Sequence, residues 1–409
     1  MKKVRYLSAR EAAGELGISL ATLYAYVSRG LIRSEATEGK KRTRRYRAED
    51  VQRLKERAEQ RRDPGKVAEG ALSWGTPVME SGITLISDDK LYYRGRDVLD
   101  LATGSSIEEV AALIWTGDSA AARQILSAEP PVLSSRYTSV RKVVDDLVPV
   151  EAFQILLPLA VVEDLAAYDL RPTAVARTGA RILRLMAAIA VKDEAKGGRV
   201  AETLQRGWTS QDPESAALFD SALVLCADHE LPVSSFAVRC VASAEATPYA
   251  AVIAGLSALQ GVKHGGQTEL VEAFLREAQT SDDVQKVMAS RLKRGESVPG
   301  FGHSLYPGGD PRGAELLRLT ATTHPRSPAV ALSAAVVEEA LDLIGERPTV
   351  DFGLMTLARA LELPPGGAIA LFALGRTVGW IGHAIEQYGS DSLIRPRARY
   401  VGEQPAGSP

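Results

Sequence analysis

Five histidines are the residues whose type best suits proton transfer or metal binding, and their neighbours distinguish them. His264 lies in a glycine-rich run between two apolar helical stretches, so its ring is expected near a helix N-terminus. His303 closes the loop Val298–His303, whose glycines allow the backbone to approach a ligand. His229 lacks a second histidine four residues on, where Val233 stands, so the zinc-protease pattern is absent. Each histidine taken alone is more often structural than catalytic.

The other candidate residues carry less information by themselves. His324 and His383 have no comparable context, and Asp351–Gly353 is a lone kinase-like triplet without the other kinase motifs. The two cysteines, Cys226 and Cys240, are too few for a disulfide framework or a four-thiolate zinc site. Both are predicted to be buried and unreactive, and no metal site is expected.

Charge is distributed unevenly along the 409 residues, although the net charge is only −2. Residues 1–62 carry 17 lysines and arginines against 8 acidic residues, a net +9, whereas the rest carry 32 against 43, a net −11. This asymmetry indicates a basic module, of the kind that meets nucleic acid, joined to an acidic globular body. The longest apolar runs, such as Ala368–Leu374, fall short of the roughly 20 residues that cross a bilayer. No apolar signal segment follows Met1–Lys3, so we expect a cytoplasmic protein without a membrane partner.

Two short helices joined by a tight turn are predicted near the N-terminus. Ser8 and Glu11 form a Ser-x-x-Glu capping box, and Gly17 ends the first helix. Ser19 can cap a second helix, which Gly30 ends in the left-handed conformation that suits glycine. A basic strip over 40–47 and a third helix reaching about Arg62 follow. This order predicts a helix-turn-helix with a basic wing.

The segment resembles the winged helix-turn-helix of the MerR family, in "YLSAREAAGELGISLATLYAYVSRGLI", the basic wing and "YRAEDVQRL". The resemblance implies that the second helix can enter the major groove of double-stranded DNA while wing arginines neutralise phosphates. An interaction domain whose basic residues only keep it soluble is the alternative. The candidate DNA-contacting residues are Thr22, Tyr24, Tyr26 and Arg29 on the second helix and Arg42, Arg44 and Arg45 on the wing.

Helical signals dominate after a linker at 63–72. The segments 83–86 and 90–93 predict a small hairpin. Ser105–Glu108 is predicted to be a capping box, opening a helix with one apolar face formed by Ile107, Val110, Ala111 and Ile114. Amphipathic stretches rich in alanine and leucine follow at 176–191, 214–227, 249–259 and 329–344. No βαβ alternation or fixed repeat is present, so the body is predicted to be mainly α-helical.

Several short motifs stand in a fixed order along this body. They are "LYYRGRDVLDLATGSSIEEVAALIWTG", "ADHE", "GVKHGG", "VPGFGH", "DPR", "RPTVDFG", "GRTVGWIGHAIEQ" and "IRPRARYVG". Together they resemble citrate synthase over roughly residues 73–402, and the ordered set is far more specific than any one motif. The resemblance implies a helical large domain over 73–265 and 346–409, with a small helical domain inserted at 266–345 and a cleft between the two. It also implies a homodimer with shared active sites, in which Arg395 reaches the neighbouring subunit's site.

The resemblance assigns roles in an aldol-type condensation of acetyl-CoA with oxaloacetate. Removing a methyl proton from a thioester requires stabilisation of the developing enolate oxygen, so a base and a donor must act together. Asp351 would be the base and His264 the donor to the thioester oxygen, with the helix N-terminus favouring its neutral ring. His303 would donate to the oxaloacetate carbonyl. Water would then hydrolyse the citryl-CoA thioester to citrate and CoA.

Substrate binding is also implied by the resemblance. Planar guanidiniums bind carboxylates bidentately, and the residues that match the dicarboxylate site are Arg312, Arg376 and Arg395, with His229. Val298, Gly300, Phe301 and Gly302 match the loop that holds the adenine of CoA. No cofactor beyond the acyl-CoA substrate is implied. Ser304 and Pro307 depart from the common "GHRVYK" pattern, which indicates weaker acyl-CoA binding, and "LPVSS" replaces the common "LNAST" after His229.

Two other functions stay open. A 2-methylcitrate synthase would use propionyl-CoA, and one methylene in a pocket changes binding by only ~1–3 kcal/mol, so the motifs do not decide between the substrates. A catalytically silent regulator would instead sense an acyl-CoA or dicarboxylate and bind DNA. The joint presence of His264, His303 and Asp351 favours catalysis.

Overall fold

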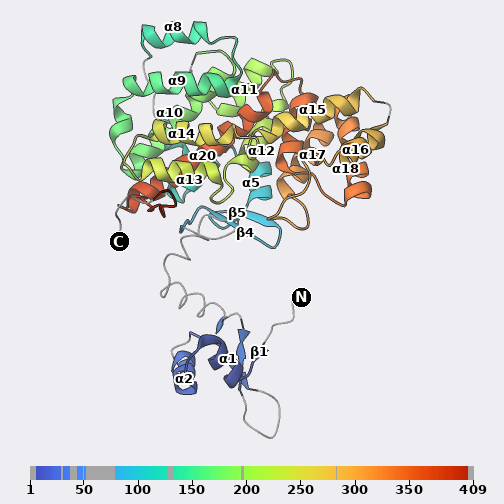
Figure 1. The fold of residues 1–409 in the computed structure, drawn as a ribbon. Coiled ribbons are helices and arrows are strands. Elements are labelled where there is room, and N and C mark those ends of the chain that lie inside the picture. The colour runs from blue at the N-terminus through green and yellow to red at the C-terminus, as the bar shows by residue number, and fades with distance from the viewer. Residues whose placement is uncertain are drawn as a thin grey trace. The chain divides into compact units, whose positions relative to one another are not determined.

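The computed structural model describes residues 6–28, 31–36, 44–48, 50–51, 79–127, 133–194, 198–281 and 283–403. Contacts between Cα atoms divide the chain into two compact units, Met1–Glu80 and Ser81–Pro409 (Figure 1). The predicted linker at 63–72 and the third helix beyond residue 51 lie outside the described residues.

The N-terminal unit has the two helices that the sequence predicts. Its elements are β1 (Tyr6–Leu7), α1 (Ala9–Leu16), α2 (Leu20–Ser28), β2 (Ser34–Ala36) and β3 (Arg44–Arg47). Ser8 and Glu11 close the predicted capping box, and Gly17 ends α1 with a φ of 62°. Ser19 Oγ accepts the backbone N–H of Thr22 at 3.2 Å, which confirms the second cap. The strands form an antiparallel sheet in the order β1-β3-β2, and β3 is the part of the predicted basic strip 40–47 that lies within the described residues.

A small hydrophobic core holds this unit together. Its buried members are Leu7, Ala12, Ala13, Leu23, Ile32, Tyr46 and Val51. The buried carboxylate of Asp50 accepts three hydrogen bonds from Arg33, one from the backbone N–H and two from the guanidinium, each 2.9 Å long. This pair fixes the chain after β3 against the turn that follows α2.

The second unit begins with the predicted hairpin and continues almost entirely as helices. Strands β4 (Thr84–Ser87), β5 (Lys90–Tyr93) and β6 (Arg96–Asp97) form one antiparallel sheet, with Thr84 opposite Tyr93. The helices that follow are α5 (Val98–Gly104), α6 (Ile107–Thr116), α7 (Ala122–Leu126), α8 (Ser135–Val143), α9 (Pro149–Glu163), α10 (Pro172–Ala190), α11 (Val200–Trp208), α12 (Ser215–Cys226), α13 (Val233–Ala242), α14 (Pro248–Leu259), α15 (Gln267–Gln279), α16 (Val284–Lys293), α17 (Pro311–Thr323), α18 (Pro328–Ile344), α19 (Val350–Ala360) and α20 (Gly367–Gly389). The mainly helical fold class is confirmed.

Helix α20 is the central element of this unit, since α6, α9, α10, α12, α13, α14 and α19 pack against it. Figure 1 shows it among α9, α10, α12, α13 and α14. Among the described residues it is the one helix long and apolar enough to cross a membrane, but 94% of its most apolar stretch is buried inside the unit, as in the core helix of a globular domain. Glycine is required on its α12 face, because a Cβ at Gly375 would lie 2.5 Å from the Leu223 carbonyl oxygen. The close approach of α12 and α20 brings Arg376 beside the chain that follows α12.

Two local predictions need correction. The capping box of α6 uses Ser106 and Glu109 rather than Ser105 and Glu108, because the Glu108 carboxylate is buried and accepts the Val200 N–H at 2.7 Å. The expected apolar face of α6 is buried as predicted. Of the two cysteines, Cys226 is fully buried, whereas Cys240 is partly exposed.

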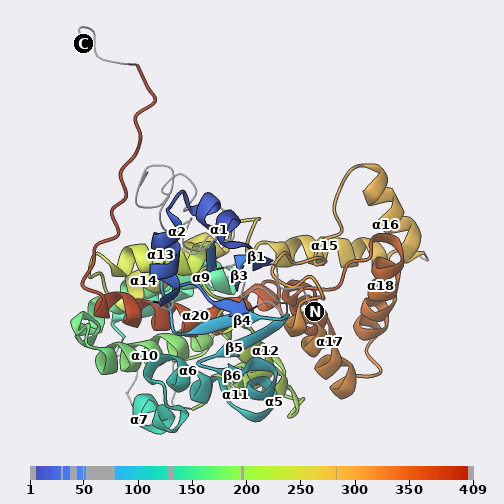
Figure 2. The ribbon, with the colours of Figure 1, turned by 90° about the horizontal axis from the view of Figure 1, so that it is seen from below.

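Helices α15 to α18 gather on one side of the second unit (Figure 2). They cover most of the range predicted for the inserted domain. Helix α19, which follows that range, packs against α15, α17 and α18 as well as against α20. Helix α19 is therefore in contact with both groups of helices.

Candidate active site

Six of the predicted residues come together where several helices begin or end. Arg312 and Asp351 are the second residues of α17 and α19, and Arg376 lies within α20. His229 follows α12, and His264 lies in the tight turn between α14 and α15. The charge of Arg312, of Arg376 or of both acts on the pKa of each of these histidines, of His303 and of Asp351, so the six groups lie in one cluster.

The cluster contains two buried guanidiniums, those of Arg312 and Arg376, which repel each other electrostatically and have different hydrogen-bond partners. Arg312 donates from Nε and Nη2 to the two oxygens of Asp310, at 2.9 and 2.8 Å, and is 2% exposed. Arg376 donates from Nε to the Cys226 carbonyl at 2.9 Å, while its buried Nη2 has no hydrogen-bond partner among the described residues. Burial, opposed by Asp228 and reinforced by Arg312, lowers the pKa of Arg376. A buried cation that lacks a carboxylate partner is an anion-binding group.

Three aromatic rings pack beside these arginines. The ring centroids of His229 and His303 lie 5.3 Å apart, and Tyr306 lies 5.6 Å from the first and 4.9 Å from the second. Burial, followed by the charges of Arg312 and Arg376, holds the pKa of His229 well below its usual value. Burial and Arg312 also lower the pKa of His303. Both imidazoles are therefore neutral at neutral pH.

The protonated nitrogen of His303 follows from the backbone around it. Its Nδ1 accepts the Leu305 N–H at 3.2 Å, so the single proton of the neutral ring lies on Nε2. His303 thus offers one N–H donor to a ligand.

His264 is held by contacts on two sides. Its Nε2 lies 2.8 Å from the buried Ser234 hydroxyl, and its ring packs edge-on against Phe372 of α20. Arg376 lies over the same phenylalanine, with its Cζ 4.8 Å from the ring centroid. Burial and the Arg376 charge lower the pKa of His264 to about 4, which keeps the ring neutral; these causes differ from the helix N-terminus that the sequence suggested. If the serine donates to Nε2, Nδ1 carries the proton and is free to donate to substrate.

Asp351 is partly exposed as a residue, but one of its carboxylate oxygens, Oδ1, is buried. Its Oδ1 is buried and has no hydrogen-bond partner among the described residues. Burial raises the pKa of this carboxyl to about 6, against the opposing charge of Arg312. At neutral pH the group is ionised yet poorly solvated, as a general base requires.

The glycine-rich loop that ends at His303 is fastened to the start of α19. The Gly302 N–H donates to the Arg347 carbonyl at 3.0 Å, and the Thr349 N–H donates to the Gly300 carbonyl at 2.8 Å. Gly300 has a φ of 82°, and a Cβ there would lie 2.9 Å from Val271 Cγ2 and 3.0 Å from Phe352 Cβ. Only glycine fits this position, and the loop thereby fixes His303 relative to Asp351.

Asp228 and His383 form a buried pair next to His229 that the sequence motifs did not predict. His383 is fully buried and its Nε2 lies 3.2 Å from Asp228 Oδ1, although it was given no context in the sequence. Thr84 donates to the other Asp228 oxygen at 2.5 Å, and the Tyr93 hydroxyl donates to the Asp228 carbonyl at 3.0 Å. Burial raises the pKa of Asp228, but His383 and Arg376 outweigh it and the net pKa is lowered. The long separation in sequence hid this pair.

Arg395 is the predicted residue that the structure does not bring to the cluster. It is exposed in the segment after α20, which runs away from the helices (Figure 2). No ion pair is recorded for Arg395 within the described part of the chain. No group of three or more His, Cys, Asp or Glu suited to a metal ion is present among the described residues.

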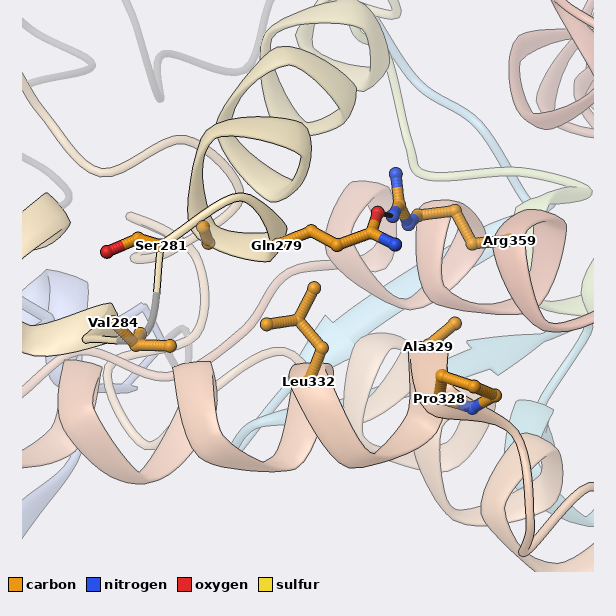
Figure 3. A pocket seen from close by; sticks show the side chains of 8 residues that line it. Gln279, Ser281, Val284, Pro328, Ala329, Leu332 and Arg359 are labelled. Carbon is orange, nitrogen blue, oxygen red and sulfur yellow. Dashed lines mark hydrogen bonds between the residues drawn. The ribbon is translucent and has the colours of Figure 1, made fainter.

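A cavity of about 260 Å³ lies elsewhere in this unit, between α15, α16, α18 and α19. Figure 3 shows the Gln279 side chain reaching Arg359 above Leu332 and Ala329. Arg359 also pairs with Glu272 at 3.6 Å, so its charge is already matched. None of the predicted site residues lines this cavity.

The predicted DNA-contacting residues of the N-terminal unit have mixed environments. Tyr24 is 52% exposed, and Arg44 is exposed on β3. Tyr26 is partly buried against the hydrophobic core, and the Thr22 hydroxyl lies 2.9 Å from Ser19 Oγ. Arg45 pairs with Glu35 at 3.2 Å and lies over the ring of Tyr6. Arg29 and Arg42 lie outside the described residues.

Comparisons with known proteins agree with both units. A family model described as "Citrate synthase, C-terminal domain" matches residues 71–397, and one described as "Helix-turn-helix domain" matches residues 6–59. The chain is 30% identical to a citrate synthase of Haloferax volcanii, over 81% of this chain and 95% of that protein. It is 28% identical to 2-methylcitrate synthase 2 of Corynebacterium glutamicum, over 77% and 90% of the two chains. The crystal structure of citrate synthase from Thermotoga maritima superposes with a TM-score of 0.69 at 27% identity, covering 82% of this chain and 96% of that one. Carrying a helix-turn-helix ahead of its helical body, this chain belongs to the citrate synthase family of acyltransferases.

Proposed function

We propose that this protein condenses acetyl-CoA with oxaloacetate and water to give citrate and CoA. The observation that carries the proposal is the buried Arg376 guanidinium, whose Nη2 has no hydrogen-bond partner among the described residues and which lies in one cluster with Arg312, three neutral histidines and Asp351. Such a cluster suits a dianionic substrate beside a base of raised pKa.

The dicarboxylate binds to the two arginines and His229. Arg312 is held by Asp310 through Nε and Nη2, so its remaining edge faces a ligand in a fixed orientation. Arg376 supplies the second cation. Both guanidiniums are buried and have already lost their contact with bulk water. Substrate carboxylates can therefore bind to them without first displacing a hydration shell.

The acyl-CoA methyl loses a proton to Asp351, whose buried Oδ1 has no competing donor. His264 donates to the thioester oxygen as negative charge develops there, with Ser234 holding the other ring nitrogen. The resulting enol carbon attacks the oxaloacetate carbonyl, and His303 donates its Nε2 proton to that carbonyl oxygen. Water then cleaves the thioester of the condensed product and releases CoA. The loop residues Val298, Gly300, Phe301 and Gly302 support the adenine side of the CoA.

Release of CoA, followed with a thiol reagent, tests this proposal directly. Purified full-length protein is given oxaloacetate and either acetyl-CoA or propionyl-CoA over a concentration series. A higher kcat/KM for acetyl-CoA supports citrate formation. A higher value for propionyl-CoA means that the same reaction gives 2-methylcitrate, the product named for the Corynebacterium relative. Folded protein that releases no CoA with either thioester contradicts the proposal and favours a regulatory role.

The position of Arg395 supports a homodimer with shared sites. The residue is exposed, and within one chain the cluster has two arginines instead of the three that the family resemblance implies. Arg395 would complete the site of a second copy. Co-expressed Arg395→Ala and His264→Ala chains test this, since a mixed dimer then contains one site with both residues intact. Recovery of activity toward half of the wild-type value is expected for the purified mixed dimer, or toward a quarter for randomly assorted chains, and two inactive chains that stay inactive together refute sharing.

The N-terminal unit would bind double-stranded DNA in the cytoplasm through α2 and the wing. The net charge of +9 over residues 1–62, the helix-turn-helix match and the exposed Tyr24 and Arg44 support this role. Binding to a mixed-sequence duplex should weaken steeply with salt. It should also fall in the Tyr24→Ala/Arg44→Ala variant, while the control Arg276→Ala in the acidic body binds like wild type. Equal binding by all three proteins refutes a DNA contact at α2 and β3.

A further inference from the structure

Tyr306 is a buried residue that touches three groups of the active site. Only 1% of its surface is exposed. Its hydroxyl lies 2.9 Å from His229 Nε2, its ring packs against His303, and Arg312 Cζ lies 5.7 Å from the ring centroid. The sequence motifs gave no reason to single it out. Its contacts place it between the two substrate-facing histidines and one of the arginines.

The hydrogen bond to His229 has one favourable direction. Burial, with Arg312 opposing it, raises the pKa of Tyr306 to about 12, so the hydroxyl keeps its proton. No other hydrogen-bond partner of this hydroxyl is present among the described residues. If the tyrosine donates, the buried O–H and the lone pair of His229 Nε2 are both satisfied. If His229 donated instead, the buried O–H would lack an acceptor, which is unfavourable in a desolvated site.

We propose that Tyr306 is a positioning residue that holds His229 as the tautomer protonated on Nδ1. A neutral imidazole has one N–H, and accepting at Nε2 places that proton on Nδ1. His229 then presents a neutral donor to an oxygen of the bound dicarboxylate. The identity of that ligand rests on the proposed function, whereas the tautomer does not.

The tautomer matters because fixed cations already surround this ring. The charges of Arg312 and Arg376 disfavour protonation of His229, so the ring stays neutral and can offer a ligand only one N–H hydrogen bond. The backbone N–H of Leu305 sets the tautomer of His303 in the same way, leaving Nε2–H on that ring. The two rings therefore present opposite nitrogens as donors, each chosen by a partner on the segment 305–306.

The nitrogen NMR spectrum of the full-length protein tests the tautomer without turnover. Protein labelled with 15N at histidine gives separate signals for protonated and unprotonated ring nitrogens, and a His229→Gln variant assigns the pair. We expect a protonated Nδ1 and an unprotonated Nε2 on His229, and a mixture or reversal in Tyr306→Phe. The control Tyr249→Phe removes another buried hydroxyl, bonded to Asp164, and should leave the His229 signals unchanged. A wild-type ring protonated on Nε2 overturns the inference.

Binding supplies a second readout. Calorimetric titration with oxaloacetate should show affinity about tenfold weaker in Tyr306→Phe than in wild type, with Tyr249→Phe unchanged. In the turnover assay, Tyr306→Phe should raise the KM for oxaloacetate by about the same tenfold factor and leave the KM for acyl-CoA unchanged. If no CoA is released by any protein, the proposed function fails, yet the NMR result still decides the tautomer. Normal turnover with unaltered oxaloacetate affinity in Tyr306→Phe contradicts the positioning role alone.

Discussion

The Asp351→Asn substitution should remove catalysis while making the folded protein more stable at neutral pH. Burial raises the pKa of Asp351 to about 6 from an ordinary value near 3.8, a difference of about two units. Each unit corresponds to about 1.4 kcal/mol, so ionisation of the native carboxyl costs at most about 3 kcal/mol above pH 6. Asparagine does not ionise, and it keeps nearly the same shape.

The sign follows from proton linkage. A raised native pKa gives stability that is fully present below the unfolded pKa and is lost as pH rises through the native pKa. The wild type should therefore lose stability relative to Asp351→Asn between about pH 4 and pH 6. Above pH 6 the variant should be more stable by about 1–3 kcal/mol, where the lower figure allows for the amide protons that asparagine buries.

Two assays check this prediction. Denaturant unfolding at pH 4 and pH 7.5 should give a stability difference that is near zero at the lower pH and favours the variant at the higher pH. CoA release should fall by about 10²–10⁴-fold in the variant, the usual contribution of a general base, and the wild-type rate should rise toward a plateau above pH 6. A variant that is less stable than wild type at pH 7.5, or that turns over normally, refutes the assignment of Asp351 as a desolvated base.

Three further substitutions separate binding from folding. Arg376→Gln should weaken oxaloacetate binding more than tenfold, measured by calorimetry. It should lower stability less than the loss of a buried ion pair, because within the described residues the guanidinium bonds to the Cys226 carbonyl and to no carboxylate; a large drop in melting temperature with unchanged binding contradicts this. Arg312→Leu should instead destabilise the fold by about 3–5 kcal/mol in denaturant unfolding, since it leaves the buried Asp310 unpaired, and a fold as stable as wild type rules this out. Gly379→Ala should cost about 1–3 kcal/mol by the same measurement, because its Cβ would overlap Asp228, whereas wild-type stability would show that the helices can separate there.

Predictions that depend on neighbours in sequence were mostly confirmed. The capping box at Ser8, the cap at Ser19 and the hairpin 83–93 form as expected, and the four amphipathic stretches are α10, α12, α14 and α18. The box at α6 was displaced by one residue. The sequence offers two serine–glutamate pairs there, and the choice depends on Val200, which takes Glu108.

The site required contacts that no local pattern reveals. His383 bonds to Asp228 across 155 residues, and Tyr306 bonds to His229 across 77. Asp310 stood in a motif, but its bidentate pair with Arg312 became visible only when α17 was placed. Arg395 keeps its predicted role only as a proposal, since a single chain leaves it exposed.

The sequence by itself determined the two N-terminal helices, the caps at Ser8 and Ser19, the main amphipathic helices, the order of the motifs and the chemical type of each site residue. These features depend on side chains within a few positions of one another, where hydrogen bonds to the backbone are set by spacing. The tertiary structure decided which cation lacks a partner, which imidazole nitrogen carries the proton and how far the pKa of Asp351 rises. Those properties depend on desolvation and on charges brought together from α12, α17, α19 and α20, and neither exists until the helices pack.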